Sequence, residues 1–196
     1  MKKSILLLIT TVIIIAVGCR KIELDGEKEI IIVTQPGSGS TTGQTIYLKG
    51  TITADTVLRS TNTYILQGPV VMDNNKTMTI EPGTVIKGAY SGSDVGFLVI
   101  TRGSKINAQG TSEKPIVFTS ASANPQSGDW GGIVICGKAA INTTLNGTPN
   151  LVNVEGLQGL TGTQGNAGSG DNNPVLNDNS GILSYVRIEY AGYAFQ

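Results

Sequence analysis

The sequence predicts an all-β protein, a right-handed parallel β-helix that follows an amino-terminal signal helix and a flexible tether. Three observations carry this prediction. Two segments 20 residues apart are alike, which is typical of a solenoid. Apolar and polar residues alternate within short runs, as they do in strands. The chain is rich in Gly, Thr, Ser and Asn and only 14% charged, a composition that suits an extracellular β protein with many turns.

The chain begins with the features of an export signal, which we assign to residues 1–18. Lys2 and Lys3 give a short positive start, and residues 5–17 are apolar apart from two threonines. This apolar run is shorter than the roughly 20 residues that a membrane-spanning helix needs. We therefore expect the segment to direct export.

Cys19 lies directly behind this run and is the predicted site of lipid attachment. The small residues Ala16-Val17-Gly18 precede it, which resembles a bacterial lipoprotein box, although such boxes usually carry Leu where Ala16 stands. Acylation would make the membrane a partner of the chain, because two or more acyl chains give stable anchoring. Ordinary secretion and an uncleaved anchor are the alternatives. The predicted location is the bacterial outer membrane or cell surface, with the leaflet left open.

If Cys19 carries lipid, Cys136 has no partner for a disulfide within the chain. It stands in the apolar run "GGIVICG", where a free cysteine usually behaves as a small buried apolar residue. We expect Cys136 to be a buried thiol.

Residues 19–45 are predicted to be the acylated cysteine and a flexible tether. The segment contains mixed charge and then "TQPGSGSTTGQT", a composition that cannot bury enough surface to offset the entropy of ordering it. The folded domain is expected to span residues 46–196.

The self-similarity lies between "MTIEPGTVIKGA" (78–89) and "LVITRGSKINAQ" (98–109). Ile80 matches Ile100, Gly83 matches Gly103 and Ile86 matches Ile106. We interpret each unit as one coil in which Gly supplies the positive φ of a corner. Like residues should then stack, Ile80 on Ile100 and, outside, Glu81 on Thr101 and Lys87 on Asn107.

Further strands are expected in "PIVFTS", "GGIVICG" and "ILSYVRIEY", with a long loop at about 143–179 between the last two. Five glycines recur at every third residue from Gly156 to Gly168, but this stretch contains no proline, so collagen is excluded and a flexible excursion is predicted. The closing "EYAGYAFQ" leaves a strand without a cap, so we expect the domain to be truncated at its carboxyl terminus, as a fragment of a longer protein.

The segments "TMTIEPGTVIKG" (77–88), "GTSEKPIVFTSASA" (110–123), "GDWGGIVICGKAAIN" (128–142) and "NSGILSYVRIEYAG" (179–192) occur in this order. In them the chain resembles uncharacterised Bacteroidota surface lipoproteins that carry right-handed parallel β-helix repeats. The resemblance covers roughly residues 46–196 and implies the fold. It implies little about activity.

Several chemistries are excluded by composition. The chain has no histidine, which removes Ser-His-Asp and Cys-His nucleophiles and the usual zinc sites. It has 14 basic and 14 acidic residues without a basic stripe, so nucleic acid is not an expected partner. No catalytic residue is assigned.

Two weaker sites remain. Trp130 with Asp129 could form a stacking plate and an acceptor for a sugar, or Trp130 could pack over the corner of a coil. Asp171 and Asp178, among several asparagines, are candidate calcium ligands, although Asn and Asp are also what turns demand. No other cofactor is expected.

The sequence favours a lipid-anchored cell-envelope protein whose β-helix acts as a non-catalytic binding or adhesion module for glycan or for another envelope protein. One alternative is a carbohydrate-active β-helix enzyme, similar to polysaccharide lyases, with its site in missing coils. Such a site needs several converging carboxylates, and the predicted stacks provide none. The other alternative is a structural spacer.

Overall fold

The computed structural model describes residues 33–35 and 43–194, and the backbone alone for residues 33–35. Apart from the short 3-10 helix η1 (Gly92–Asp94), the elements in the described residues are strands. Their bounds are β1 Val33–Gln35, β2 Thr45–Ile52, β3 Thr56–Leu58, β4 Thr63–Met72, β5 Thr77–Ile80, β6 Val85–Gly88, β7 Phe97–Ile100, β8 Lys105–Gln109, β9 Ile116–Ser120, β10 Gly132–Ile135, β11 Thr144–Leu145, β12 Thr148–Pro149, β13 Val152–Asn153, β14 Asn166–Ala167, β15 Gly181–Ser184 and β16 Val186–Ile188.

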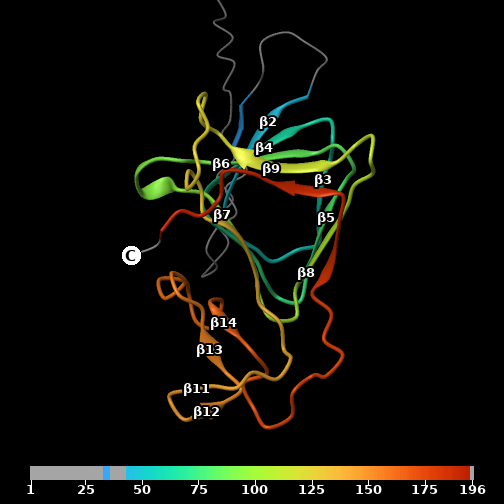
Figure 1. Cartoon of the computed structure of the whole chain (residues 1–196). Helices are drawn as coiled ribbons and strands as arrows, with labels where there is room; N and C mark the ends of the chain where they lie inside the picture. Colours follow the sequence, from blue (N-terminus) through green and yellow to red (C-terminus); the bar gives the residue numbers. More distant parts are fainter. Residues whose placement is uncertain (1–32, 36–42, 195–196) are drawn as a thin grey trace, which may run out of the picture.

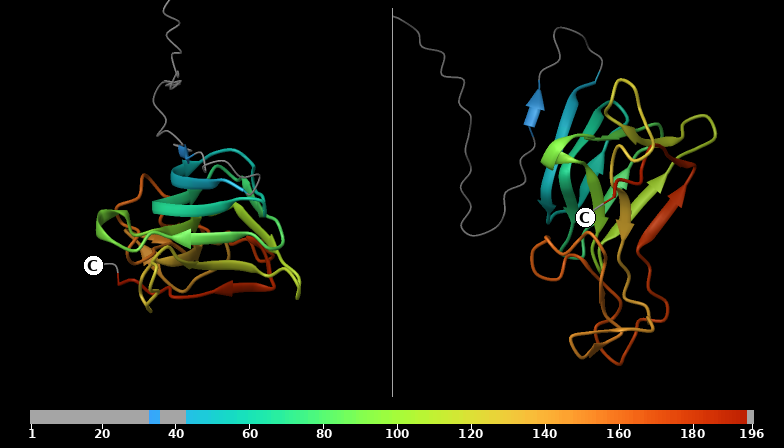
Figure 2. Two further views of the ribbon diagram at one scale, coloured as in Figure 1. Left: turned by 90° about the horizontal axis from the view of Figure 1, so that it is seen from above. Right: turned by 60° about the vertical axis from the view of Figure 1, so that its left-hand side comes forward.

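The strands wind into a parallel β-helix with three faces, which Figure 1 shows nearly along the axis and Figure 2 shows as stacked coils. The first face joins the amino-terminal halves of β2 and β4 to β6, β9 and β16. The second face joins their carboxyl-terminal halves to β7 and β10. The third face contains β3, β5, β8 and β15. The predicted fold class is therefore confirmed as an all-β parallel β-helix.

The 20-residue stacking register is wrong. Ile80 lies beside Ala108, Ile100 lies beside Met72, and Lys87 lies beside Thr119. Glu81 does not lie beside Thr101 either, because the Glu81 amide donates to the Leu58 carbonyl whereas the Thr101 amide donates to the Met72 carbonyl, each at 3.0 Å.

The reason for this error is that the three-sided coil has several corners with similar sequences. Residues 78–89 run from the third face to the first, whereas residues 98–109 run from the second face to the third. Loops 89–96 and 121–131, which join the first face to the second, also differ in length, so the coils have no constant period. The similarity between residues 78–89 and 98–109 therefore reflects one type of corner that occurs at two places in the coil, and it does not mark a repeated coil.

The predicted corner chemistry holds at both places. Gly83 and Gly103 have φ of 85° and 86°, a region that favours glycine. The hydroxyl that follows is buried in each corner: the Thr84 hydroxyl donates to the Glu81 carbonyl at 2.7 Å, and Ser104 lies 3.3 Å from Thr101. These bonds satisfy polar groups that the tight turn would otherwise bury unpaired.

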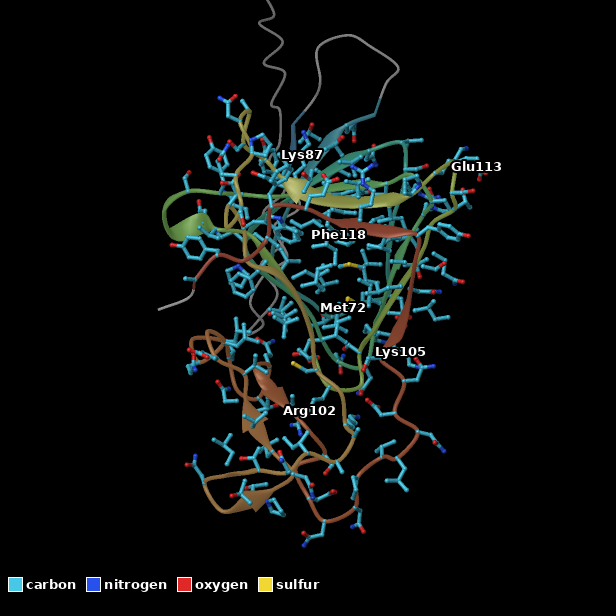
Figure 3. The ribbon with its side chains drawn as sticks, in the orientation of Figure 1. Met72, Lys87, Arg102, Lys105, Glu113 and Phe118 are labelled. Atoms are coloured by element: carbon cyan, nitrogen blue, oxygen red, sulfur yellow. The ribbon has the colours of Figure 1, made fainter. Side chains whose placement is uncertain are left out.

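The core lies along the axis, where apolar side chains from all three faces meet. Alternation along each strand places one set of residues inside, and this set includes the buried side chains of Met78, Ile80, Ile86, Leu98, Ile100 and Ile106. Figure 3 shows Met72 and Phe118 inside the triangular section and Lys87 outside it.

Residues 137–180, between β10 and β15, fold against the outside of the second face (Figure 1), and we call this segment the insertion. It contains the two-stranded ladders β11–β12 and β13–β14. Its Leu157 is 1% exposed and packs with Val71, Phe97 and Val99, which point away from the axial core. The predicted loop at 143–179 is thus no flexible excursion. Its few apolar residues, spaced among glycines, have no periodicity that would have revealed a packed face.

The predicted tether is wrong at residues 33–35, where β1 pairs antiparallel with β2, Val33 lying opposite Tyr47. This strand covers the edge of the first coil, which would otherwise expose unpaired backbone groups. The signal, Cys19 and the remainder of the tether lie outside the described residues. Within the described ranges no helix is long and apolar enough to cross a membrane.

The covered second face can be tested with two matched substitutions. Val99 is 0% exposed although it points outward, whereas Val117 points outward from the first face and is partly exposed. We expect Val99→Thr to lower the free energy of unfolding by about 1–3 kcal/mol, because the added hydroxyl would be buried where the packed apolar side chains offer it no hydrogen-bond partner. Val117→Thr should change it by less than about 0.5 kcal/mol. Denaturant unfolding measures both, and equal effects would show that the insertion does not cover Val99.

Candidate functional site

Trp130 does not present a stacking surface. It is 0% exposed, its ring lies parallel to that of Phe118 at 6.3 Å, and its indole Nε1 donates to the Glu189 carbonyl at 2.7 Å. Gly88 makes room for it, since a Cβ there would come within 2.5 Å of the Trp130 side chain. With no ring face open to a sugar, the indole serves as core packing, the alternative that the sequence left open.

Asp129 is engaged in building its own loop. One of its carboxylate oxygens accepts the Ser120 hydroxyl at 2.5 Å and the Gln126 backbone amide at 3.0 Å. These bonds hold the 121–131 loop over the corner that Trp130 fills. Asp129 and Trp130 thus lie together, as the sequence predicts, but in a structural arrangement.

Asp171 and Asp178 are also engaged by hydrogen bonds within the protein, Asp171 in a turn and Asp178 between the two ends of the insertion. Asp171 accepts the Asn173 backbone amide at 2.9 Å, and Asp178 accepts the Lys138 backbone amide at 2.8 Å. In the part of the chain that the structure describes, no three Asp, Glu or Cys side chains gather closely enough to hold a metal ion. Calcium ligation by these two aspartates therefore receives no support from the geometry.

Cys136 is a buried free thiol, as expected. It is 0% exposed and belongs to the cluster between the second face and the insertion, together with Leu157. Burial raises the pKa of the Cys136 thiol, and the positive charge of Arg102 opposes this shift only in part. Cys136 is therefore protonated and inert at neutral pH.

A polar hollow of about 320 Å³ lies where the insertion meets the corners of two coils. Figure 3 shows Arg102 at this junction. The hollow is lined by Asp73, Thr101, Arg102, Lys138, Thr163 and Ser169. Asp73 follows β4 and Arg102 follows β7 at the same edge of the second face, while Lys138, Thr163 and Ser169 belong to the insertion.

Asp73 accepts three hydrogen bonds from within the protein. Its Oδ1 accepts the Thr101 hydroxyl at 2.8 Å and the Asn74 amide at 2.8 Å, and its Oδ2 accepts the Gln164 side-chain amide at 2.8 Å. Burial raises the pKa of Asp73, but the bonds from Gln164, Asn74 and Thr101 outweigh it, so the net pKa is lowered. The carboxylate remains charged and is used to tie the insertion to the corner.

Arg102 strengthens the same junction. Its Nη1 donates to the carbonyls of Gly168 and Ser169 at 3.1 and 3.3 Å. These neutral acceptors fix the guanidinium without cancelling its charge. Gly170 leaves space for it, since a Cβ there would lie 3.0 Å from Nη1.

Lys138 brings a second positive charge to the hollow. Its Nζ lies over Gly103, where a Cβ would approach it to 2.7 Å. The ion pairs found among the described residues join Lys49 to Asp94, Arg59 to Glu81 and Arg187 to Glu189. Neither Arg102 nor Lys138 belongs to a pair within those residues, so two cations face the hollow without an anionic partner.

The arrangement is suited to binding an anion. Two cations and the hydroxyl of Thr163 are donors, while the one carboxylate of the hollow has its oxygens turned to internal donors. Sequence reasoning missed this site. Asp73, Arg102 and Lys138 are far apart in the chain, and only the "TRG" corner could have signalled that Arg102 lies beside a turn.

Fold and hollow together define a parallel β-helix with a cationic site beside its second face. Residues 50–196 match the family described as pectate-lyase like beta helix domain, which is more than half of the chain. The protein therefore belongs to this family of β-helix domains. No curated protein and no solved structure matches the chain.

The lowered pKa of Asp73 has a consequence for stability against pH. A carboxyl whose pKa is lower in the folded state stabilises the fold above its unfolded pKa, and this contribution is lost as pH falls through that range. We expect the difference in free energy of unfolding between wild type and Asp73→Asn to be largest at neutral pH and to shrink below about pH 4. Denaturant unfolding at several pH values measures it.

Gln164→Ala is the matched control for this experiment, because it removes one of the donors that lower the Asp73 pKa. The pH-dependent part of the stability should become smaller in this variant. A wild-type advantage over Asp73→Asn that stays constant from neutral pH to about pH 3 would contradict the assignment.

Proposed function

We propose that this protein is a lipid-anchored module of the bacterial cell surface that binds acidic carbohydrate without cleaving it. The observation that carries the proposal is that two cations, Arg102 and Lys138, line the hollow beside the insertion without an ion pair among the described residues. A carboxylate or sulfate on a sugar can accept charge-assisted hydrogen bonds from both groups.

The family description supports the same ligand class. Pectate is a polymer of galacturonate, with one carboxylate on each sugar, and the chain belongs to a pectate-lyase-like family. The Ser169 hydroxyl donates within the protein, to the Asp171 carbonyl at 3.1 Å, but the hollow also offers the hydroxyl of Thr163 beside its two cations. Such groups suit the hydroxyls of a sugar ring, because specific sites combine a few placed polar groups with a concave shape.

Binding without cleavage is favoured over the lyase-like alternative. The described residues provide no group of three metal-binding side chains, and the carboxylate in the hollow is occupied by three internal donors. An envelope protein with an acidic surface segment is the other partner that the hollow could accept. A spacer would need no unpaired cations at all.

The anchor is part of this proposal. Cys19 stands 14 positions before Val33, where β1 begins its pairing with the first coil. A fully extended chain spans at most about 3.5 Å per residue, so the β-helix would stay within roughly 50 Å of an acylated Cys19. The hollow would then sample ligands close to the cell surface.

Binding is tested with Lys138→Gln and the control Lys87→Gln, which removes a lysine from the outside of the first face (Figure 3). We expect Lys138→Gln to weaken binding of polygalacturonate at least about tenfold, because a charge-assisted hydrogen bond is lost. Lys87→Gln should leave binding unchanged. Calorimetry gives the affinity, and the ultraviolet absorbance of unsaturated sugars reports cleavage. Steady appearance of that absorbance would establish a lyase, and equal weakening by both variants would remove the hollow as the site.

The anchor is tested by mass spectrometry of the protein from membrane fractions. We expect the mature chain to begin at Cys19 and to carry acyl chains, because the small residues before it fit cleavage of the signal at that point. Cys19→Ser should release the protein from the membrane. A mature chain that begins at Cys19 without lipid would contradict the anchor.

A further inference from the structure

We infer that the hollow receives a single acidic sugar residue end-on, at the terminus of a chain or branch, and that a polymer does not lie across the coils at this site. The inference rests on the proposed function, since it concerns how the same hollow reads its ligand. It follows from the size of the hollow, from its walls and from the placement of its charges.

The size admits about one sugar ring. At about 320 Å³ the hollow lies at the lower end of the range, about 300–1,000 Å³, that small-molecule sites occupy. Several consecutive sugar subsites would need an elongated groove. The hollow is bounded instead by six residues from two coil corners and the insertion.

The walls close the path that a polymer would take along the second face. The outward residues Val71, Phe97 and Val99 are buried beneath the insertion. The insertion is also tied down beside the hollow, because Gln164 donates to Asp73 at 2.8 Å and to Thr51 at 3.2 Å. Arg102 adds its bonds to Gly168 and Ser169. The insertion therefore occupies the outside of the second face beside the hollow, so a polymer cannot lie along that face there.

The charges match one anionic group. Arg102 and Lys138 are the cations of the hollow. The guanidinium of Arg102 lies beside Gly170 and the ammonium of Lys138 lies beside Gly103, and both glycines leave room for these groups. Asp73 is turned inward by its three donors and does not repel the ligand as strongly as a free carboxylate would. One carboxylate between two cations completes the site, and a second carboxylate on the next sugar would find no partner there.

The test compares ligands of increasing length on the full chain in detergent. Galacturonate, its dimer, trimer and hexamer, and polygalacturonate are titrated by calorimetry, with neutral galactose as the uncharged analogue. We expect Kd per molecule to change by less than about twofold from dimer to hexamer, and polygalacturonate to bind in proportion to its chain ends and not to its total sugar content. Galactose should bind at least about tenfold more weakly than galacturonate.

Two variants sharpen the test. Thr163→Trp places a large side chain at the rim without altering any charge, and it should abolish binding of every length, because the ring can no longer enter. Lys87→Gln removes a lysine from the outside of the first face, far from Arg102 in Figure 3, and should change nothing. Circular dichroism checks that each variant is folded.

The outcomes separate the two levels of the proposal. Affinity that climbs steadily from dimer to hexamer, or polymer binding that survives Thr163→Trp, would overturn end-on recognition while leaving acidic-glycan binding in place. Equal affinity for galactose and galacturonate would overturn the charge-based reading of the hollow. If none of these ligands binds, polygalacturonate included, the proposed function itself is overturned.

Discussion

The parallel stacking of inward apolar side chains is the constraint on which the rest of this protein depends. One coil has no closed core, so stability comes from contacts between neighbouring coils. Phe118 rests beside Ile86 in the ladder, and Trp130 stacks on Phe118 from the next corner. Because backbone ladders and side-chain stacks share one register, every corner is held at a defined height along the axis. The loops attached to those corners therefore also begin and end at defined positions along the axis.

The second face shows how such a scaffold acquires a site. Its outward residues Val71, Phe97 and Val99 are apolar, and they supply a dry surface on which the insertion folds. The insertion is too rich in glycine to bury a core of its own, and it gains one from the coils. Its docking carries Lys138 to the corner that already holds Arg102. The proposed binding site therefore lies at the junction of the coils and the insertion.

Asp73 connects stability to this junction. A carboxylate near two cations would ordinarily pair with one of them, and the hollow would then have little attraction for an anion. Here Thr101, Asn74 and Gln164 occupy its oxygens. The bond from Gln164 also holds the insertion in place, so the fold uses the negative charge internally and leaves Arg102 and Lys138 without an ion pair among the described residues. Sites of this kind are expected where a specific partner repays the cost of unpaired charge.

The sequence by itself determined the class of fold, the inward residues of most strands and the glycine corners, because alternation and turn chemistry are local properties of a few neighbouring residues. It did not determine the register, since similar corners at Gly83 and Gly103 belong to different edges of the triangle. The burial of Trp130 and the docking of the insertion were likewise decided by tertiary structure alone. So was the meeting of Asp73, Arg102 and Lys138, because unequal loops set which distant residues share a height along the axis.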